Sequence, residues 1–467
     1  MEEEKDILLV VPISKTHYVV PPIGLGYLAS ALRSNGLSGV AILDCIKEEL
    51  SFKEMGIRLK AIAPKVIGFQ VFSYDFNSVE KSISIIKRIL PATIIVVGGP
   101  HVSAVGDSVL MEIKDADFGF IGEAENGFAL LMRRVIRNED IPFKDIPGLI
   151  WRAGDIVHSN QRDLVQDLDK LVFPAWDLIE PSSYPDNPQG GFYKKFPIAP
   201  ILTSRGCPYL CTFCGSGVNM GRKLRLRSID KVLAEMDILY NDFGVREFHI
   251  IDDMFNFHKE RVMEFCQGIR KRGWNISYTF PNGLRLNQLD REVLQEMKDT
   301  GAYTFTVGIE SGSQRILDLM QKNLTLKLIE EKVNLINSVG LEPNGFFILG
   351  YPDETIEDME ATIRFAKRLP LKRAHFSNFL PLPGTEATKR LIRDEEIKMP
   401  SWGTLFYSKV AYSPKGIDSK KLKKMQRKAF FEFYLRPGIL CRMILDIKSV
   451  SHLKMVIKRA FDYLLFR

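Results

Sequence analysis

Two series of apolar strands alternating with amphipathic helices run along the 467-residue chain, and this alternation limits the possible folds most strongly. In the first series, apolar runs at 7–12, 39–44, 66–73 and 93–101 predict strands, and the pattern at 25–36 predicts a helix. Buried strands that alternate with helices form parallel sheets covered on both faces. The first 140 residues therefore predict a doubly wound, Rossmann-like α/β domain.

The second series predicts six strands with five connecting helices. The strands are expected at 198–204, 247–253, 275–281, 303–310, 344–350 and 373–380. The helices are expected at 228–242, 258–272, 289–299, 313–339 and 354–368. Eight such units close a complete barrel, so six predict a partial (β/α)6 barrel with its ligands at the C-terminal ends of the strands.

Proline-rich and basic segments mark the predicted domain boundaries of the chain. The predicted domains are 1–140, a proline-rich connector at 141–195 with a hairpin at 148–159, the barrel at 196–410, and a helical basic region at 411–467. From Lys420 onward there are 13 Lys and Arg residues against three acids, whereas the preceding 419 residues sum to −3. The tail is either a basic helix pair that closes the fold or a surface that docks on an anionic membrane or an acidic partner.

Composition places the chain among soluble globular proteins, with 45% hydrophobic and 26% charged residues. No apolar run approaches the roughly 18 residues of a membrane span. The start, MEEEKDILLVVP, is acidic and does not resemble a signal peptide. The expected compartment is the cytoplasm, with membrane association through the tail as an option.

Three of the six cysteines form a tight cluster. Cys45, Cys266 and Cys441 are isolated among apolar residues and are expected in the core. Cys207-x3-Cys211-x2-Cys214 lies on a loop rich in Gly, Pro and Ser. A structural zinc site takes four ligands, and no fourth lies nearby. The spacing therefore favours a [4Fe-4S] cluster with one open iron, and a zinc-bearing interaction protein remains an alternative of another class.

This spacing, with an aromatic residue just before the third cysteine, resembles the radical S-adenosylmethionine (SAM) superfamily over about 195–410. The resemblance implies that the open iron binds SAM, which is cleaved to a 5′-deoxyadenosyl radical. Polar or glycine-containing motifs at successive strand ends extend the likeness. The SAM-binding residues it implies are Phe213, Asp252, Asp253, Gly308, Glu310, Ser311, Ile348 and Gly350.

The N-terminal domain resembles the cobalamin-binding domain that precedes many radical SAM barrels, through PPIGLGYLASALRSNG, VVGGPH and GEAEN. The Asp-x-His-x-x-Gly motif that supplies a histidine ligand to cobalt is absent, so cobalamin is expected without a histidine ligand. The implied cobalamin-binding residues are Phe72, Ser73 and Tyr74 at the lower face, with Gly98, Gly99, Gly122 and Glu123.

Together these likenesses identify a cobalamin-dependent radical SAM enzyme, similar to the class B methyltransferases. They imply methyl transfer from SAM through methylcobalamin to an unactivated carbon of a small or hydrophobic, lipid-like metabolite. They also imply a low-potential electron donor such as flavodoxin or ferredoxin, and no nucleic-acid partner. A cyclase or oxidase with the same cofactors remains an alternative function. A methylthiotransferase would carry three further cysteines in the N-terminal domain for a second cluster, and this domain contains only Cys45.

Overall fold

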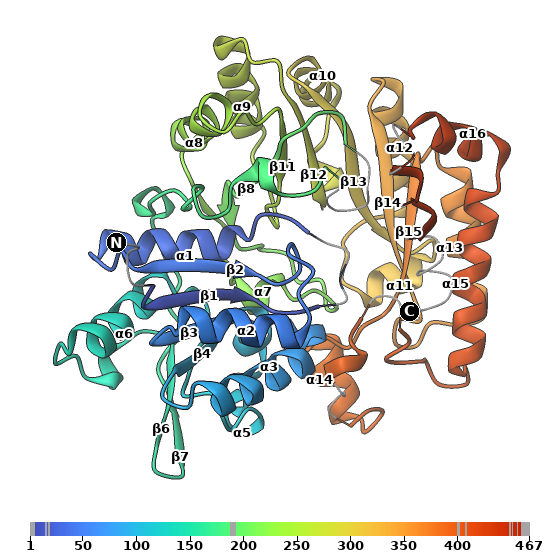
Figure 1. Ribbon diagram of the computed structural model, residues 1–467. Helices are drawn as coiled ribbons and strands as arrows, with labels where there is room; N and C mark the ends of the chain where they lie inside the picture. The colour runs from blue at the N-terminus through green and yellow to red at the C-terminus, as the bar shows by residue number, and fades with distance from the viewer. Residues whose placement is uncertain are drawn as a thin grey trace. The chain divides into compact units, whose positions relative to one another are not determined.

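The chain divides into two compact units in a computed structural model (Figure 1). Unit 1 consists of Met1–Pro185 and Gly215–Gly221, and unit 2 of Asp186–Cys214 and Arg222–Arg467. The structure describes residues 5–14, 16, 19–186, 193–398, 402–406, 409–447, 450, 452–454 and 456–458.

Unit 1 is built on a seven-stranded sheet. Its strands, in spatial order, are β2 (Val40–Asp44), β1 (Ile7–Val11), β3 (Val66–Gln70), β4 (Ile94–Gly98), β5 (Phe118–Phe120), β6 (Leu149–Ala153) and β7 (Ile156–Ser159). The first five are parallel, and β6 and β7 add an antiparallel hairpin. This order, with β1 between β2 and β3, is that of a doubly wound sheet and confirms the predicted fold class.

Helices cover both faces of this sheet. They are α1 (Ile23–Ser34), α2 (Phe52–Ile62), α3 (Phe76–Ile89), α4 (Pro100–Val105), α5 (Ser108–Glu112), α6 (Glu125–Arg137) and α7 (Ser216–Asn219). Helix α1 lies on one side of β1, and α2 and α3 lie on the other (Figure 1). Helices α1 and α6 share one apolar core, to which Leu32 and Leu131 contribute. The hairpin predicted within the connector is thus part of the sheet of unit 1.

Unit 2 contains a six-stranded, entirely parallel sheet. Its spatial order is β15 (Arg373–Asn378), β14 (Glu342–Leu349), β13 (Ala302–Glu310), β12 (Ser277–Leu284), β11 (Glu247–Ile250) and β8 (Ile198–Ile201). Strands β8 and β15 end the order, so the sheet is open. This arrangement confirms the predicted partial (β/α)6 barrel.

The helices of unit 2 follow the predicted sequence with one difference. They are α8 (Ile229–Asn241), α9 (Lys259–Arg272), α10 (Arg291–Asp299), α11 (Gln314–Leu319), α12 (Leu326–Ser338), α13 (Ile356–Arg368), α14 (Glu386–Arg393), α15 (Ser419–Tyr434) and α16 (Pro437–Leu445). The single helix predicted at 313–339 is two helices, because Gln321 and Asn323 have φ near +52° and Thr325 caps a new N-terminus. Among the described helices, none is long and apolar enough to cross a membrane.

Helix α15 covers the open edge of the barrel sheet at β15 (Figure 1). The hydroxyl of Tyr434 accepts a hydrogen bond from the amide of Ala374 and donates one to its carbonyl. The amide group of Gln426 donates to the carbonyl of Phe376 at 2.9 Å. The tail region therefore closes the fold at this edge, which is one of the two roles that its sequence left open.

Candidate functional site

The clustered cysteines lie on a loop after β8 and β9 (Ser204–Arg205). None of the three forms a disulfide, all are half-buried, and the amide of Cys214 donates to the carbonyl of Cys211 at 3.2 Å. Burial raises the pKa of the Cys207 thiol to about 11, and the nearby Cys214, Asp253 and Cys211 add to this increase. The three sulfurs therefore lie close enough to interact electrostatically.

The donor set of this loop fits a cluster with one open iron. Within the part of the chain that the structure describes, no three His, Cys, Asp or Glu side chains converge as around a single metal ion. In an iron–sulfur cluster each thiolate binds a different iron, and the thiols of Cys207, Cys211 and Cys214, carried on one loop, can supply three such ligands. Cys45 and Cys266 are buried as expected, but the core prediction for Cys441 is wrong, because it is exposed on α16.

Asp252 fixes the start of the cysteine loop. Its carboxylate accepts hydrogen bonds from the amide of Thr203 (2.6 Å), the hydroxyl of Thr203 (2.5 Å) and the hydroxyl of Ser204 (2.6 Å). Burial raises its pKa, against the effect of these donors. The adjacent Asp253 is half-buried. Asp252 thus holds the loop in place, and contact with SAM stays a prediction for both carboxylates.

The far side of the loop is tied to the ends of other barrel elements. The amide of Thr212 donates to the carbonyl of Met320 at 3.1 Å, and the carbonyl of Thr212 accepts from the amide of Ala387 at 2.9 Å. The hydroxyl of Thr212 lies 2.7 Å from that of Tyr351, which follows β14. Backbone and side-chain bonds at both ends therefore hold the spacing of the cysteines.

Glu310, the last residue of β13, forms a buried ion pair with Lys322. Oε1 of Glu310 lies 2.7 Å from Nζ of Lys322, and the two side chains are 9% and 12% exposed. Burial opposes the lysine charge, but Glu310 and Cys211 outweigh it, so the pKa of Lys322 is raised. A Cβ on Gly308 would lie 2.6 Å from Nζ of Lys322 and closer still to Oε1 of Glu310. Glycine at 308 leaves the space that this pair fills.

The remaining predicted SAM residues are packed near the ends of β13 and β14. The hydroxyl of Ser311 is buried and lies 3.1 Å from that of Thr362. Ile348 and Phe213 pack against one apolar cluster. Gly350 has a φ of +76°, and its amide donates to the carboxylate of Glu354 at 2.5 Å. Burial raises the pKa of Glu354 to about 8.

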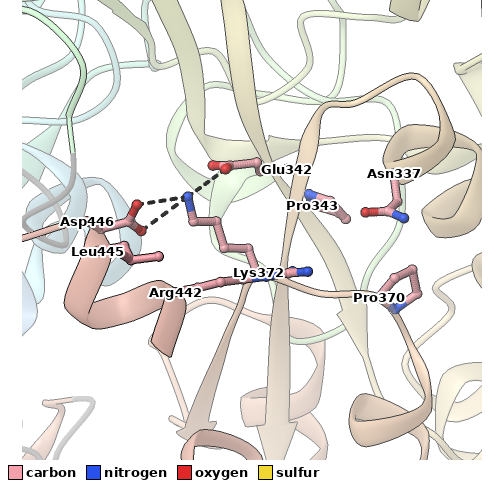
Figure 2. Close-up of a pocket in the computed structure, with 8 residues that line it drawn as sticks. All are labelled: Asn337, Glu342, Pro343, Pro370, Lys372, Arg442, Leu445 and Asp446. Atoms are coloured by element: carbon pink, nitrogen blue, oxygen red, sulfur yellow. Dashed lines mark hydrogen bonds and ion pairs between the residues drawn. The ribbon is translucent and has the colours of Figure 1, made fainter. Parts of the chain in front are cut away.

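These residues follow the C-terminal ends of parallel strands, so they share one edge of the barrel sheet. A cavity of about 230 Å³ lies at the opposite end, beside Glu342 and Lys372 near the starts of β14 and β15. Figure 2 shows the residues that line it. The ammonium of Lys372 there contacts Glu342 at 2.6 Å and Asp446 at 3.1 Å. This cavity is lined by ion pairs that fasten α16 to the barrel, away from the cysteine loop.

In unit 1, the predicted cobalamin residues follow β3, β4 and β5. The rings of Phe72 and Tyr74 stack with centroids 5.4 Å apart and planes 10° apart, and both residues are half-exposed. The hydroxyl of Ser73 lies 2.9 Å from Nδ1 of the buried His101. Burial lowers the pKa of His101 to about 4, so its imidazole is neutral at pH 7. Aromatic and polar side chains are of the kind that line cofactor sites at this edge of a doubly wound sheet, and their contact with cobalamin stays a prediction.

The glycines and Glu123 also have a role within the chain itself. A Cβ on Gly99 (φ +105°) would lie 3.1 Å from the carbonyl oxygen of Val71, and one on Gly122 (φ +83°) 2.7 Å from that of Asp163. Gly98 is more open, with its nearest neighbour at 3.9 Å. The carboxylate of Glu123 accepts from the amide of Val165 at 2.7 Å. Close chain approach accounts for Gly99 and Gly122, and their contact with a corrin stays a prediction.

Sequence reasoning missed several residues that the structure brings to these sites. Lys322 falls inside the helix predicted at 313–339, and only the break between α11 and α12 turns it toward Glu310. His101 and Asp75 adjoin predicted cobalamin residues, and burial raises the pKa of Asp75 to about 7. The motif VVGGPH contains His101, so its position after a strand was the available signal.

Two family models match this chain, one in each unit. The B12 binding domain matches residues 9–132, and the Radical SAM superfamily matches residues 201–366. A relative from Pyrococcus horikoshii, named an uncharacterized methyltransferase, is 33% identical over 98% of each chain. A cytidylyl-2-hydroxyethylphosphonate methyltransferase of Streptomyces wedmorensis is 28% identical, covering 80% of this chain and 78% of the relative. An anaerobic magnesium-protoporphyrin IX monomethyl ester cyclase of Rubrivivax gelatinosus is 26% identical, covering 79% and 66%.

Two solved structures share the fold. The cobalamin-dependent SAM radical enzyme OxsB, with aqua-cobalamin and SAM bound, has a TM-score of 0.76 at 16% identity, covering 99% of this chain and 71% of OxsB. The radical SAM methyltransferase TsrM of Kitasatospora setae, with cobalamin and a [4Fe-4S] cluster bound, has a TM-score of 0.68 at 19% identity, covering 84% and 78%. The predicted [4Fe-4S] cluster, SAM and cobalamin are thus the cofactor set of the family. The end-to-end relative and the two domain matches show that the chain belongs to the cobalamin-dependent radical SAM enzymes.

Proposed function

We propose that this enzyme is a C-methyltransferase that moves a methyl group from SAM, through cobalamin, to an unactivated carbon of a small or hydrophobic metabolite. The observation that carries the proposal is the Pyrococcus horikoshii relative, because it is named a methyltransferase and aligns over 98% of both chains. The phosphonate methyltransferase of Streptomyces wedmorensis supports the same reaction type. When bound, the cluster and SAM supply a radical, and cobalamin supplies the methyl group.

In this proposal the chain binds and orients the cofactors. Cys207, Cys211 and Cys214 ligate the cluster, and Asp252 holds their loop through the amide and hydroxyl of Thr203. Glu310, Ser311 and Gly308 at the end of β13 bind the ribose and carboxylate side of SAM. Phe213 and Ile348 shield the adenine side from water through the apolar cluster they share. In unit 1, Phe72, Ser73 and Tyr74 bind the lower face of cobalamin.

The decisive experiment is anaerobic reconstitution with iron, sulfide and hydroxocobalamin, followed by quantitation per chain. We expect about four iron, about four sulfide and about one corrinoid. The loaded enzyme is then incubated with methyl-labelled SAM, a chemical reductant and fractionated small metabolites. Methyl transfer should give equal amounts of S-adenosylhomocysteine and 5′-deoxyadenosine, with label in one product.

The matched control is Cys211→Ala, which should lose iron and 5′-deoxyadenosine formation while keeping corrinoid, because unit 1 forms its own sheet and core. Four iron without corrinoid would contradict the methyl-transfer proposal. Zinc in place of iron would contradict the radical chemistry as well.

The second candidate is a cyclase or oxidase with the same cofactors. It is favoured by the relative named a magnesium-protoporphyrin IX monomethyl ester cyclase, which covers 79% of this chain. This reaction consumes SAM only for the radical, so it predicts 5′-deoxyadenosine without S-adenosylhomocysteine and no label in the product. The ratio of these two nucleosides separates the candidates before the substrate is known.

The electron for SAM cleavage is proposed to come from a low-potential protein such as a flavodoxin or ferredoxin. Replacing the chemical reductant with reduced flavodoxin should support 5′-deoxyadenosine formation, with oxidised flavodoxin as the control. Absence of 5′-deoxyadenosine with reduced flavodoxin or ferredoxin, in enzyme that is active with the chemical reductant, would contradict a protein donor of this class.

The outer face of α15 and α16 supports a further proposal, contact with an anionic membrane surface. Phe431 and Leu435 are 42% and 63% exposed, beside basic residues on the same helix face. Basic and apolar side chains on one face are typical of helices that lie on anionic lipid. Exposed basic and apolar residues of α15, α16 and the turn between them include Lys424, Arg427, Lys428, Phe431, Leu435, Leu440, Ile444 and Leu445.

Co-sedimentation with vesicles tests this contact. The wild-type enzyme should bind vesicles with phosphatidylserine more strongly than vesicles of phosphatidylcholine alone. Leu435→Ser should weaken binding, whereas Ile57→Ser, which changes a residue with 60% exposure in unit 1, should not. Equal binding to both kinds of vesicle, or no binding, would contradict the proposal.

A further inference from the structure

Lys322 lies in the short loop that separates α11 from α12. Its neighbours Gln321 and Asn323 both have φ of +52°, and its own amide donates to the carbonyl of Leu317 at 3.0 Å. The loop geometry is therefore fixed on both sides of the lysine. The side chain of Lys322 is only 12% exposed. Lysine side chains are almost never buried unless they are paired with an opposite charge.

The partner of Lys322 is Glu310 at the end of β13, with 2.7 Å between Nζ and Oε1. Gly308 lies two residues before Glu310. A Cβ at position 308 would lie 2.6 Å from Nζ of Lys322, and glycine has none. The strand end thus provides both the opposite charge and the space for the ammonium group. Lys322 lies outside the motifs at the strand ends that predict the SAM-binding residues.

The same loop contacts the cysteine loop at several points. Nζ of Lys322 lies 5.9 Å from the ring centroid of Phe213, the residue between Cys211 and Cys214, and its charge interacts with Cys211. The guanidinium of Arg285 donates to the carbonyl of Lys322 and lies 3.9 Å from the ring centroid of Tyr209. Lys322 therefore contacts the cysteine loop both directly, at Phe213, and through Arg285, at Tyr209.

We propose that Lys322 is a positioning residue of the cluster and SAM site, which holds the Glu310 carboxylate at the strand end and places a fixed positive charge beside the Cys211 ligand. A nearby positive charge stabilises the extra electron of a reduced cluster, and burial limits the screening of that charge by salt. Loss of the charge makes the cluster harder to reduce. Loss of the ion pair frees Glu310 and weakens SAM binding.

This inference rests on the cluster and SAM sites of the proposed function but not on methyl transfer. An enzyme that loads a cluster and binds SAM without transferring methyl would contradict the proposed function and leave the role of Lys322 intact. The measurements are therefore made on the cluster and on SAM binding, without substrate.

The test compares Lys322→Met and Lys322→Arg with a matched control, Lys372→Met. Lys372 is 13% exposed and paired with Glu342 and Asp446 at the other end of the barrel strands (Figure 2). Spectroelectrochemical titration gives the midpoint potential of the reconstituted cluster, and equilibrium dialysis gives the SAM affinity.

Lys322→Met should shift the reduction equilibrium about tenfold toward the oxidised cluster, which is about 59 mV more negative for a one-electron couple. It should also weaken SAM binding about tenfold, because Glu310 loses its partner. Lys322→Arg should retain most of the wild-type potential. Lys372→Met should lower the melting temperature with the potential and SAM affinity unchanged.

Wild-type potential and SAM affinity in Lys322→Met, with only a lower melting temperature, would overturn the proposal and leave a structural ion pair. If Lys322→Met fails to load a cluster, Gly308→Ala provides the second variant. Its new Cβ would crowd both Oε1 of Glu310 and Nζ of Lys322, so the ion pair must shift while both charges are kept. A more negative potential in Gly308→Ala supports the proposal, and an unchanged potential overturns it.

Discussion

Replacement of Asp252 should loosen the cysteine loop at its first residues. The buried carboxylate accepts three hydrogen bonds, two from Thr203 and one from Ser204, with lengths of 2.5–2.6 Å. Asp252→Asn keeps the shape and one acceptor oxygen but removes the charge. Asp252→Ala removes every acceptor. The two variants therefore separate the value of the charge from that of the hydrogen bonds.

The magnitudes follow from these three bonds. Hydrogen bonds to a charged group contribute about 1.5–3 kcal/mol and neutral ones about 0.5–1.5, so Asp252→Asn loses about 3 kcal/mol of charge assistance. Part of this loss is offset, because burial raises the pKa of Asp252 and so already disfavours its charge. We expect a net cost of about 1–2 kcal/mol for Asn. For Ala we expect about 3–5 kcal/mol, since the Thr203 amide is left without an acceptor, whereas the Ser204 hydroxyl can turn to the carbonyl of Met254, 3.3 Å away.

Hydrogen–deuterium exchange of peptides that contain Thr203 measures this local opening. The Asn variant should exchange about tenfold faster and the Ala variant at least about a hundredfold faster, since 1.4 kcal/mol is a factor of ten. Iron content after reconstitution should fall in the same order. Asp290→Asn, which changes the cap of α10, is the control and should leave these peptides unchanged. Wild-type exchange and iron content in both Asp252 variants, with SAM binding lost, would refute the anchoring role in favour of direct SAM contact.

Two further substitutions test buried positions near the site. Glu354→Gln should remove a pH dependence: the pKa of Glu354 is about 8 in the folded chain against 4.5 for an ordinary glutamate, so wild-type stability should fall as pH rises from 4.5 to about 8 and then level off. Chemical unfolding at pH 6 and pH 9 checks this, and parallel profiles in both proteins would contradict it. Gly312→Ala should cost about 1–3 kcal/mol, because its Cβ would lie 2.7 Å from the backbone of Ala361 and Thr362 in α13. Gly438→Ala, with no atom within 4 Å, is the control for thermal melts, and an equal effect in both variants would count against the packing argument.

Local patterns predicted both sheets, because a buried parallel strand is a short continuous apolar run that is visible without tertiary information. The partial, open-sided barrel followed from the number of such runs. The helix break at 320–325 was not predicted, since the apolar pattern continues across it. Two residues with positive φ interrupt the helix there, and Asn323 is of a type that tolerates this conformation.

The candidate site was only partly visible in the sequence. Cysteine spacing is local, so Cys207, Cys211 and Cys214 stood out. The contact of Thr212 with Tyr351 joins residues 139 positions apart, and sequence alone does not bring them together. Cys441 illustrates the opposite error, because it is exposed on α16 together with the apolar Leu440, Ile444 and Leu445.

The packing of α15 on the edge strand β15 predicts how C-terminal truncation changes the solubility of the protein. In a protein that ended near residue 410, the backbone groups of Ala374 and Phe376 at the edge of β15 would be exposed. Side chains of α15 form hydrogen bonds with these groups in the full chain. Unpaired edge strands are templates for strand addition between copies. The same truncation removes the strongly basic tail and leaves a nearly neutral protein with little mutual repulsion. Helix α15 thus limits aggregation by covering the edge strand, and the basic region at 411–467 adds electrostatic repulsion between molecules.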